Sequence, residues 1–113
     1  MRAHQIAARA AELVGGDRDR QHGKKLTNFA NIALMWNAYL AIRREPGQPL
    51  DAADVAHMMV LMKTARTQTG TLNLDDHIDM AGYAACAGEV AHALALGLAP
   101  ETDDPELDTA PAS

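Results

Sequence analysis

Two cations, Lys63 and Arg66, are the first residues whose types and spacing could do chemistry. They are three positions apart and therefore share one face of a helix, with Met59 one turn before Lys63 on the same face. An ammonium and a guanidinium beside an apolar strip can hold phosphate oxygens while a base packs on the apolar part. The alternative is that cations in the last turn of a helix only complement its dipole.

Three carboxylates, Asp75, Asp76 and Asp79, open a later helix. Asp79 shares a helical face with each of the other two, since it lies four and three positions after them. Paired carboxylates can hold Mg²⁺, which takes one or two of them together with substrate phosphates. Capping by Asp75 and stabilisation of the helix dipole explain the same residues. Asp79 is a turn inside the helix and fits capping least, so Asp76 and Asp79 are the candidate metal ligands.

Four other side chains complete the candidate ligand site: His22, Asn28, Trp36 and Tyr83. His22 could donate to a phosphate or act as an acid or base, and Asn28 could hydrogen-bond a base or ribose edge. Trp36 offers a stacking surface, and Tyr83 lies one turn after Asp79 on the same face. A solvated loop histidine and a core or interface tryptophan are the more ordinary interpretations of His22 and Trp36.

Several catalytic motifs are missing from the sequence. It contains no GxGxxG, GxxxxGK[ST] or GxSxG segment, and its five histidines form no HExxH pattern. The single cysteine, Cys86, excludes an intrachain disulfide and a cysteine-based zinc site. We therefore expect a protein that is not an enzyme, with no cofactor unless the carboxylates hold Mg²⁺.

The elements that must position these residues are helices. The 113 residues are 48% hydrophobic and only 4% aromatic, which favours closely approaching helices built from Ala, Leu and Met over a β-sandwich. We expect one all-α domain over residues 1–98, a compact bundle of about four helices, followed by a disordered acidic tail over 99–113. The expected helices, with Thr27 and Asp51 as N-caps of the second and third, cover about 3–14, 26–42, 51–68 and 75–96.

The net charge and the length of the chain indicate which classes of partner to expect. A formal net charge of −5 makes nucleic-acid binding unlikely, and no stretch of about 18 apolar residues or signal peptide is present, so no membrane partner is expected. A helical unit of this size buries a modest core, so we expect a homo-oligomer.

Three segments read together resemble a known family: HGKKLTNFANIALMWNAYL, DAADVAHMMVLMKTARTQTG and DDHIDMAGYAACAGEVA. The family consists of small bacteriophage and prophage proteins catalogued as a domain of unknown function, and the match covers about residues 17–91. A more distant similarity is to the nucleotide modification-associated helical domain. The resemblance implies an all-helical fold, a phage origin and a place in the host bacterial cytoplasm. Its blocks fall on His22, Gly23, Asn28, Trp36, Met59, Lys63, Arg66, Asp79, Gly82 and Tyr83.

A looser similarity is to the helical nucleotide pyrophosphohydrolases of the MazG type, whose two acidic motifs gather Mg²⁺. Asp76-x-x-Asp79 matches the second motif. The first is missing, since Asn28 and Asn31 stand where acids would be needed. This departure argues against pyrophosphohydrolase activity.

Three functions follow as hypotheses. The first is a phage protein that binds a nucleotide-like phosphate ligand without catalysis, for example to sequester a host immune-signalling nucleotide as an anti-defence protein. The second is a Mg²⁺-dependent nucleotide hydrolase that uses Asp75, Asp76 and Asp79. The third is a protein-interaction or inhibitor module with a host protein as its partner, which the Met-rich third helix and acidic tail would suit.

Overall fold

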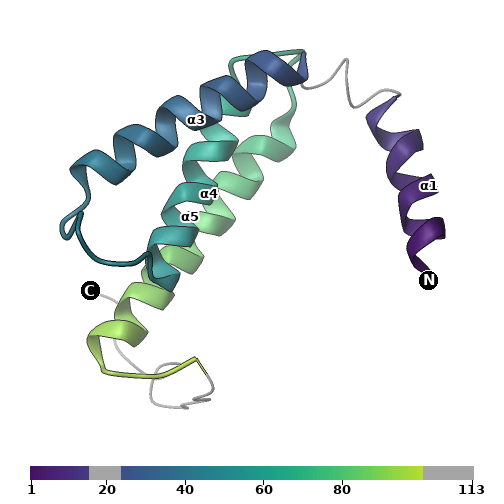
Figure 1. Cartoon of the computed structure of the whole chain (residues 1–113). Coiled ribbons are helices and arrows are strands. Elements are labelled where there is room, and N and C mark those ends of the chain that lie inside the picture. Colours follow the sequence, from purple (N-terminus) through teal and green to yellow (C-terminus); the bar gives the residue numbers. More distant parts are fainter. Residues whose placement is uncertain (16–23, 101–113) are drawn as a thin grey trace.

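The regular structure of the chain is helical. The computed structural model describes residues 1–15 and 24–100 (Figure 1). Within these ranges the helices are α1 (Ala3–Val14), α3 (Lys25–Ile42), α4 (Ala52–Arg66) and α5 (Leu74–Ala95). This confirms the expected all-α fold and its four helices. His22 and all but the first two residues of the expected tail lie outside the described residues.

The start of α4 follows the sequence expectation. Asp51 is the N-cap, and its Oδ1 accepts a hydrogen bond from the backbone N–H of Asp54 at 2.8 Å. In return, Asp54 Oδ2 accepts from the backbone N–H of Asp51 at 2.9 Å. This reciprocal capping box satisfies two backbone donors that the first turn of a helix leaves open.

Two other helix starts differ from expectation. Helix α3 begins at Lys25 after Lys24, which makes no side-chain cap bond, so the expected Thr27 cap is wrong. Helix α5 begins at Leu74, and the side chain of Asn73 accepts from the backbone N–H of Asp75 at 3.1 Å. The alternative that Asp75 caps this helix is therefore wrong, because Asn73 is the cap and Asp75 lies with Asp76 inside the first turn.

Helix α4 lies between α3 and α5 and packs against both (Figure 1). The Trp36 indole N–H donates to the carbonyl of Met58 at 2.8 Å and ties α3 to α4. The Thr64 hydroxyl lies 3.1 Å from the sulfur of Met80 and ties α4 to α5. Helices α3 and α4 run antiparallel, so the start of α3 lies beside the end of α4. Asn28 and Arg66, two of the candidate site residues, lie at this end.

The core within this layer is small. Among the described residues, the buried apolar side chains are Ile32, Met58, Ala65 and Ala87. Sixteen large apolar side chains within residues 1–15 and 24–100 are exposed, which is a large apolar surface for helices of this size. No residue of α1 is buried, and Figure 1 shows this helix apart from the other three. None of the described helices combines the length and the apolar character needed to cross a membrane.

Candidate functional site

The cationic and acidic residues singled out in the sequence meet between the end of α4 and the start of α5. Lys63 Nζ lies 2.8 Å from Asp79 Oδ2 and 3.9 Å from Asp76 Oδ1. Arg66 Nε lies 3.5 Å from Asp76 Oδ1. These four residues, the Lys63 cluster, bring two cations and two carboxylates together, so its formal charges cancel.

Burial within the Lys63 cluster is uneven. The side chain of Asp76 is 4% exposed and that of Lys63 is 12% exposed, whereas Asp79 is 44% exposed. Asp76 therefore depends on its cationic partners for charge compensation, since a buried carboxylate without a partner is costly. Asp79 reaches solvent and depends on Lys63 much less.

The cluster contains both candidate metal ligands, Asp76 and Asp79. The ammonium of Lys63 lies within 4 Å of both carboxylates proposed as metal ligands, where it supplies the positive charge that a cation would bring. In the part of the chain that the structure describes, no group of three His, Cys, Asp or Glu side chains is arranged to hold a metal ion.

Beside this cluster, a hollow of about 500 Å³ opens between α3 and α4. We call it the Asn28 hollow; its lining residues are Asn28, Phe29, Ile32, Ala33, Trp36, Met62 and Arg66. Its walls are apolar and aromatic, and its polar groups are an amide and a guanidinium. Hollows of this size with few polar groups are typical of small-molecule sites.

The amide of Asn28 is the unusual group in the hollow. Asn28 is only 8% exposed, and its Oδ1 is buried without a hydrogen-bond partner among the described residues. Leaving a buried acceptor unsatisfied costs about 1–3 kcal/mol. Most such groups in folded proteins have a partner, so the unpaired acceptor distinguishes Asn28 from the other residues that line the hollow.

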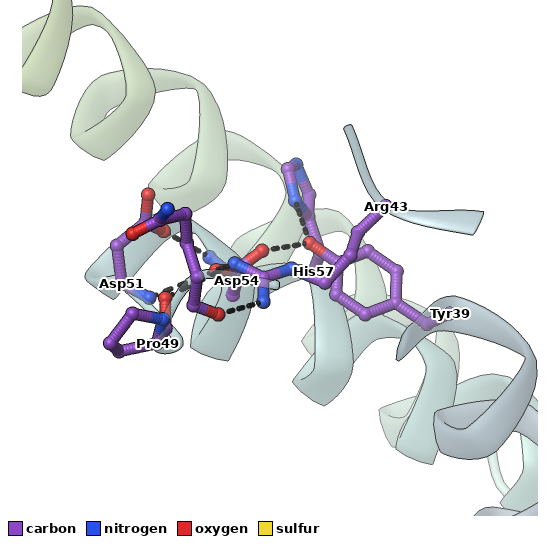
Figure 2. A network of polar contacts seen from close by, with 7 residues as sticks. Tyr39, Arg43, Pro49, Asp51, Asp54 and His57 are labelled. Carbon is purple, nitrogen blue, oxygen red and sulfur yellow. Dashed lines mark hydrogen bonds and ion pairs between the residues drawn. The ribbon is translucent and has the colours of Figure 1, made fainter. Parts of the chain in front are cut away.

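A second polar network, which the sequence did not reveal, ties α3 to α4 at the opposite end. Figure 2 shows Arg43 reaching from the end of α3 to the carboxylate of Asp54, with Nη2 2.6 Å from Oδ2. The same guanidinium donates to the carbonyls of Gln48 at 2.6 Å and Pro49 at 3.2 Å. The Tyr39 hydroxyl donates to Asp54 Oδ1 at 2.6 Å and lies 3.2 Å from Nδ1 of His57.

The pKa values of Asp54 and Tyr39 in this network are moved away from neutral pH in opposite directions. The hydrogen bond from Tyr39 is the largest cause that lowers the pKa of Asp54, followed by the bond from the Asp51 backbone and the nearby Arg43. Burial, aided by the bond to Asp54, raises the pKa of Tyr39 to about 12. A general acid or base works best with a pKa near the operating pH. These two groups are therefore suited to fixing the α3–α4 corner and not to moving protons.

A family model described as a domain of unknown function, DUF6378, matches residues 5–91. The chain belongs to the DUF6378 family. The Gene 55 protein of Mycobacterium phage D29 is 35% identical over 85 residues, which are 75% of this chain and 52% of that protein. The Gene 55 protein of Mycobacterium phage L5 is 35% identical over 79 residues, 70% of this chain and 47% of that protein.

These matches confirm the resemblance to phage proteins of unknown function. This DUF6378 chain spans about half the length of the curated relatives it matches. No solved structure matches it. The family match spans every described residue of the Lys63 cluster and the Asn28 hollow.

The structure brings together part of the expected site. Asn28, Trp36 and Arg66 line one hollow of this DUF6378 domain, and Arg66 joins it to Lys63 and Asp79. Met59 and Tyr83 are half-buried on α4 and α5 and do not line the Asn28 hollow. The indole N–H of Trp36 is occupied by Met58, so only its ring faces are left for a ligand.

Proposed function

We propose that this DUF6378 chain binds a nucleotide-like anionic small molecule in the Asn28 hollow and does not turn it over. The observation that carries the proposal is the buried, unpaired Oδ1 of Asn28, a residue that lines that hollow. An amide oxygen only accepts hydrogen bonds. The ligand must therefore present an N–H or O–H group, as the edge of a nucleobase or a ribose hydroxyl does.

The remaining walls suit the other parts of such a ligand. Phe29, Trp36 and Met62 provide apolar surface against which a flat ring can pack. Arg66 lies at the border between the hollow and the Lys63 cluster, and Asp76 faces its Nε at 3.5 Å. A guanidinium is the side chain best matched to phosphate geometry, so Arg66 is the group that would receive a phosphate.

The charge pattern favours binding over hydrolysis. A Mg²⁺ ion held by Asp76 and Asp79 would have to displace the Lys63 ammonium from between them. A binder without a metal lowers the free concentration of its ligand. In a phage protein, that property fits sequestration of a host signalling nucleotide, which would make the protein an anti-defence factor.

The test is thermal unfolding of the chain with a panel of mono-, di-, tri- and cyclic nucleotides and ADP-ribose in the presence of Mg²⁺. A ligand that binds only the native state stabilises it by mass action, by about 2.7 kcal/mol at one hundred times its Kd. Each sample is then analysed by mass spectrometry. A raised Tm with intact nucleotide supports the proposal. Consumed nucleotide supports an enzyme instead, and no shift across the panel contradicts the proposal and favours a protein partner.

A matched pair of variants locates the site. Asn28→Leu removes the buried acceptor, so we expect the ligand-induced shift in Tm to disappear while the free energy of unfolding stays equal or rises. Asn37 is exposed on the same helix, so Asn37→Leu should keep the ligand response. If Asn28→Leu keeps the full response, the ligand binds elsewhere.

A further inference from the structure

Helix α1 is an amphipathic helix without buried residues. Ile6, Ala10 and Leu13 recur at the spacing of one helical face, and Ile6 and Leu13 are 55% and 39% exposed. Its polar side carries the Arg9–Glu12 ion pair of 2.9 Å. Isolated helices shorter than about 12–15 residues are marginal in water. This 12-residue helix therefore needs a surface to cover its apolar face.

The rest of the chain offers such a surface along α4 and α5. A trough of about 590 Å³, the α4–α5 trough, is lined by Tyr39, His57, Val60, Leu61, Ala84, Ala87, Gly88 and Ala91. Its four α5 residues follow the spacing of a single helical face, so their small side chains form a smooth floor. A methyl group placed on Gly88 would meet no atom within 4 Å, so the space above it is open.

The trough continues toward the α3–α4 corner. A neighbouring hollow shares Tyr39, His57 and Ala91 with it and extends to Ala95. From Ala84 to Ala95, the floor of this groove is about 16 Å long at 1.5 Å per residue, and the apolar helix α1 is about 18 Å long. The groove and the helix therefore match in length, and the part of the groove that the α4–α5 trough forms matches the helix in apolar character.

Charge also favours this pairing. The part of α5 that forms the floor carries one acid, Glu89, and no lysine or arginine, and the charged residues that line the neighbouring hollow are three acids and two arginines. Residues 2–14 contain two arginines, Arg2 and Arg9, against the single acid Glu12. The segment that would enter the groove thus has a net positive charge where the groove has a small net negative one, which helps encounter and orientation.

We propose that α1 of a second copy of this chain fills the α4–α5 trough, and that the two copies exchange these helices reciprocally in a homodimer. Within one chain α1 lies apart from the helices that form the trough (Figure 1). Exchange of an identical element between protomers is a low-cost route to a two-fold dimer. It would cover part of the apolar surface that a single chain leaves exposed.

The first test measures the molar mass of the full chain and three variants by light scattering. The wild type should have twice the chain mass of 12.1 kDa. Ile6→Asp with Leu13→Asp removes the apolar face of α1, and Gly88→Leu fills the trough, so each should give a monomer. Gly82→Leu is the matched control, because Gly82 lies on the same helix, also has open space and does not line the trough. It should remain a dimer.

The variants themselves should fold. Glycine is about 0.8–1.0 kcal/mol less favourable than alanine inside a helix, and leucine ranks just behind alanine. Both glycine variants should therefore keep at least the wild-type helix content by circular dichroism. A monomeric Gly88→Leu chain with full helix content would therefore report a blocked surface and not a broken fold.

The decisive test mixes the two monomeric variants. The α1 variant has an open trough, and the Gly88→Leu variant has an intact α1, so the mixture should form a dimer that neither variant forms alone. A wild type that is monomeric overturns the proposal, as does a mixture that stays monomeric beside a dimeric wild type. A Gly82→Leu variant that is also monomeric would place the interface on another face of α5 and equally overturn it.

Discussion

Arg43 and Asp54 form a buried ion pair that joins the end of α3 to the first turn of α4, with Nη2 2.6 Å from Oδ2 (Figure 2). Their side chains are only 9% and 10% exposed. The carboxylate is also bound by the Tyr39 hydroxyl and by the backbone of Asp51. One carboxylate thus fixes the geometry of the corner from which α3 and α4 run together toward the Asn28 hollow.

Loss of Arg43 should destabilise the chain far more than loss of an exposed arginine. Removing one member of a buried pair leaves an uncompensated charge, so Arg43→Met should lower the free energy of unfolding by about 3 kcal/mol. The control is Arg9→Met, because the Arg9–Glu12 pair is 64% and 69% exposed and such pairs contribute about 1 kcal/mol or less. Urea unfolding at neutral pH measures both. Equal losses would mean that the corner does not depend on this pair.

Acid should weaken the fold through Asp54. The bond from Tyr39, with those from Asp51 and Arg43, holds its pKa in the native state below the ordinary value. Its contribution to stability is therefore complete above about pH 4 and is lost as pH falls through the lower native pKa. The gap in unfolding free energy between wild type and Asp54→Asn should be large at pH 7 and shrink in acid. A gap independent of pH would show that Asp54 is not charged in the native state.

Alkali should weaken the same corner through Tyr39. Burial and the bond to Asp54 raise its pKa to about 12, whereas an unfolded tyrosine ionises near about pH 10. The neutral phenol is favoured in the native state, so the stability it contributes is present below about pH 10 and lost as pH rises toward 12. The chain has two tyrosines, so Tyr83→Phe leaves Tyr39 as the only one. The ultraviolet absorbance of its phenolate should show the high midpoint in the native protein and the ordinary one in denaturant.

Local patterns in the sequence predicted the elements well, because each depends on neighbouring residues. The apolar spacing and the acidic residue at Asp51 placed α4, and the capping box there adds Asp54 as the reciprocal partner. The errors at Thr27 and Asp75 concern only where the helices start, and a helix boundary is defined to within one or two residues. At α5 the cap is the neighbouring polar residue Asn73.

The contacts between residues of different helices could not be predicted from local patterns in the sequence. Lys63 and Asp79 were each recognisable as candidates, but their contact depends on the register of α4 against α5, which no periodicity gives. The same holds for Arg43 and Asp54 across the α3–α4 corner. The i, i+4 spacing of Tyr39 and Arg43 on one face of α3 is the signal that could have pointed to that network.

The register of α4 against α5 also leads to a prediction about metal binding. Because the Lys63 ammonium lies within 4 Å of Asp76 and Asp79, Mg²⁺ should not raise the Tm of the wild type. Lys63→Met should destabilise the chain, since it leaves the buried carboxylate of Asp76 with Arg66 as its remaining cationic partner. Mg²⁺ can bind through one or two carboxylates and its own waters. It should therefore restore part of the Tm lost in Lys63→Met.

Asp79→Asn provides the control, and thermal unfolding with and without Mg²⁺ is the measurement. Asp79 is 44% exposed, so its replacement alone should cost little. Combined with Lys63→Met, it should remove the response to Mg²⁺, because it takes away one of the two carboxylates. The opposite pattern, a wild type that Mg²⁺ stabilises and a Lys63→Met variant that it does not, would show that the ammonium helps to bind a metal complex. That result would restore Asp76 and Asp79 as metal ligands and reopen the hydrolase hypothesis.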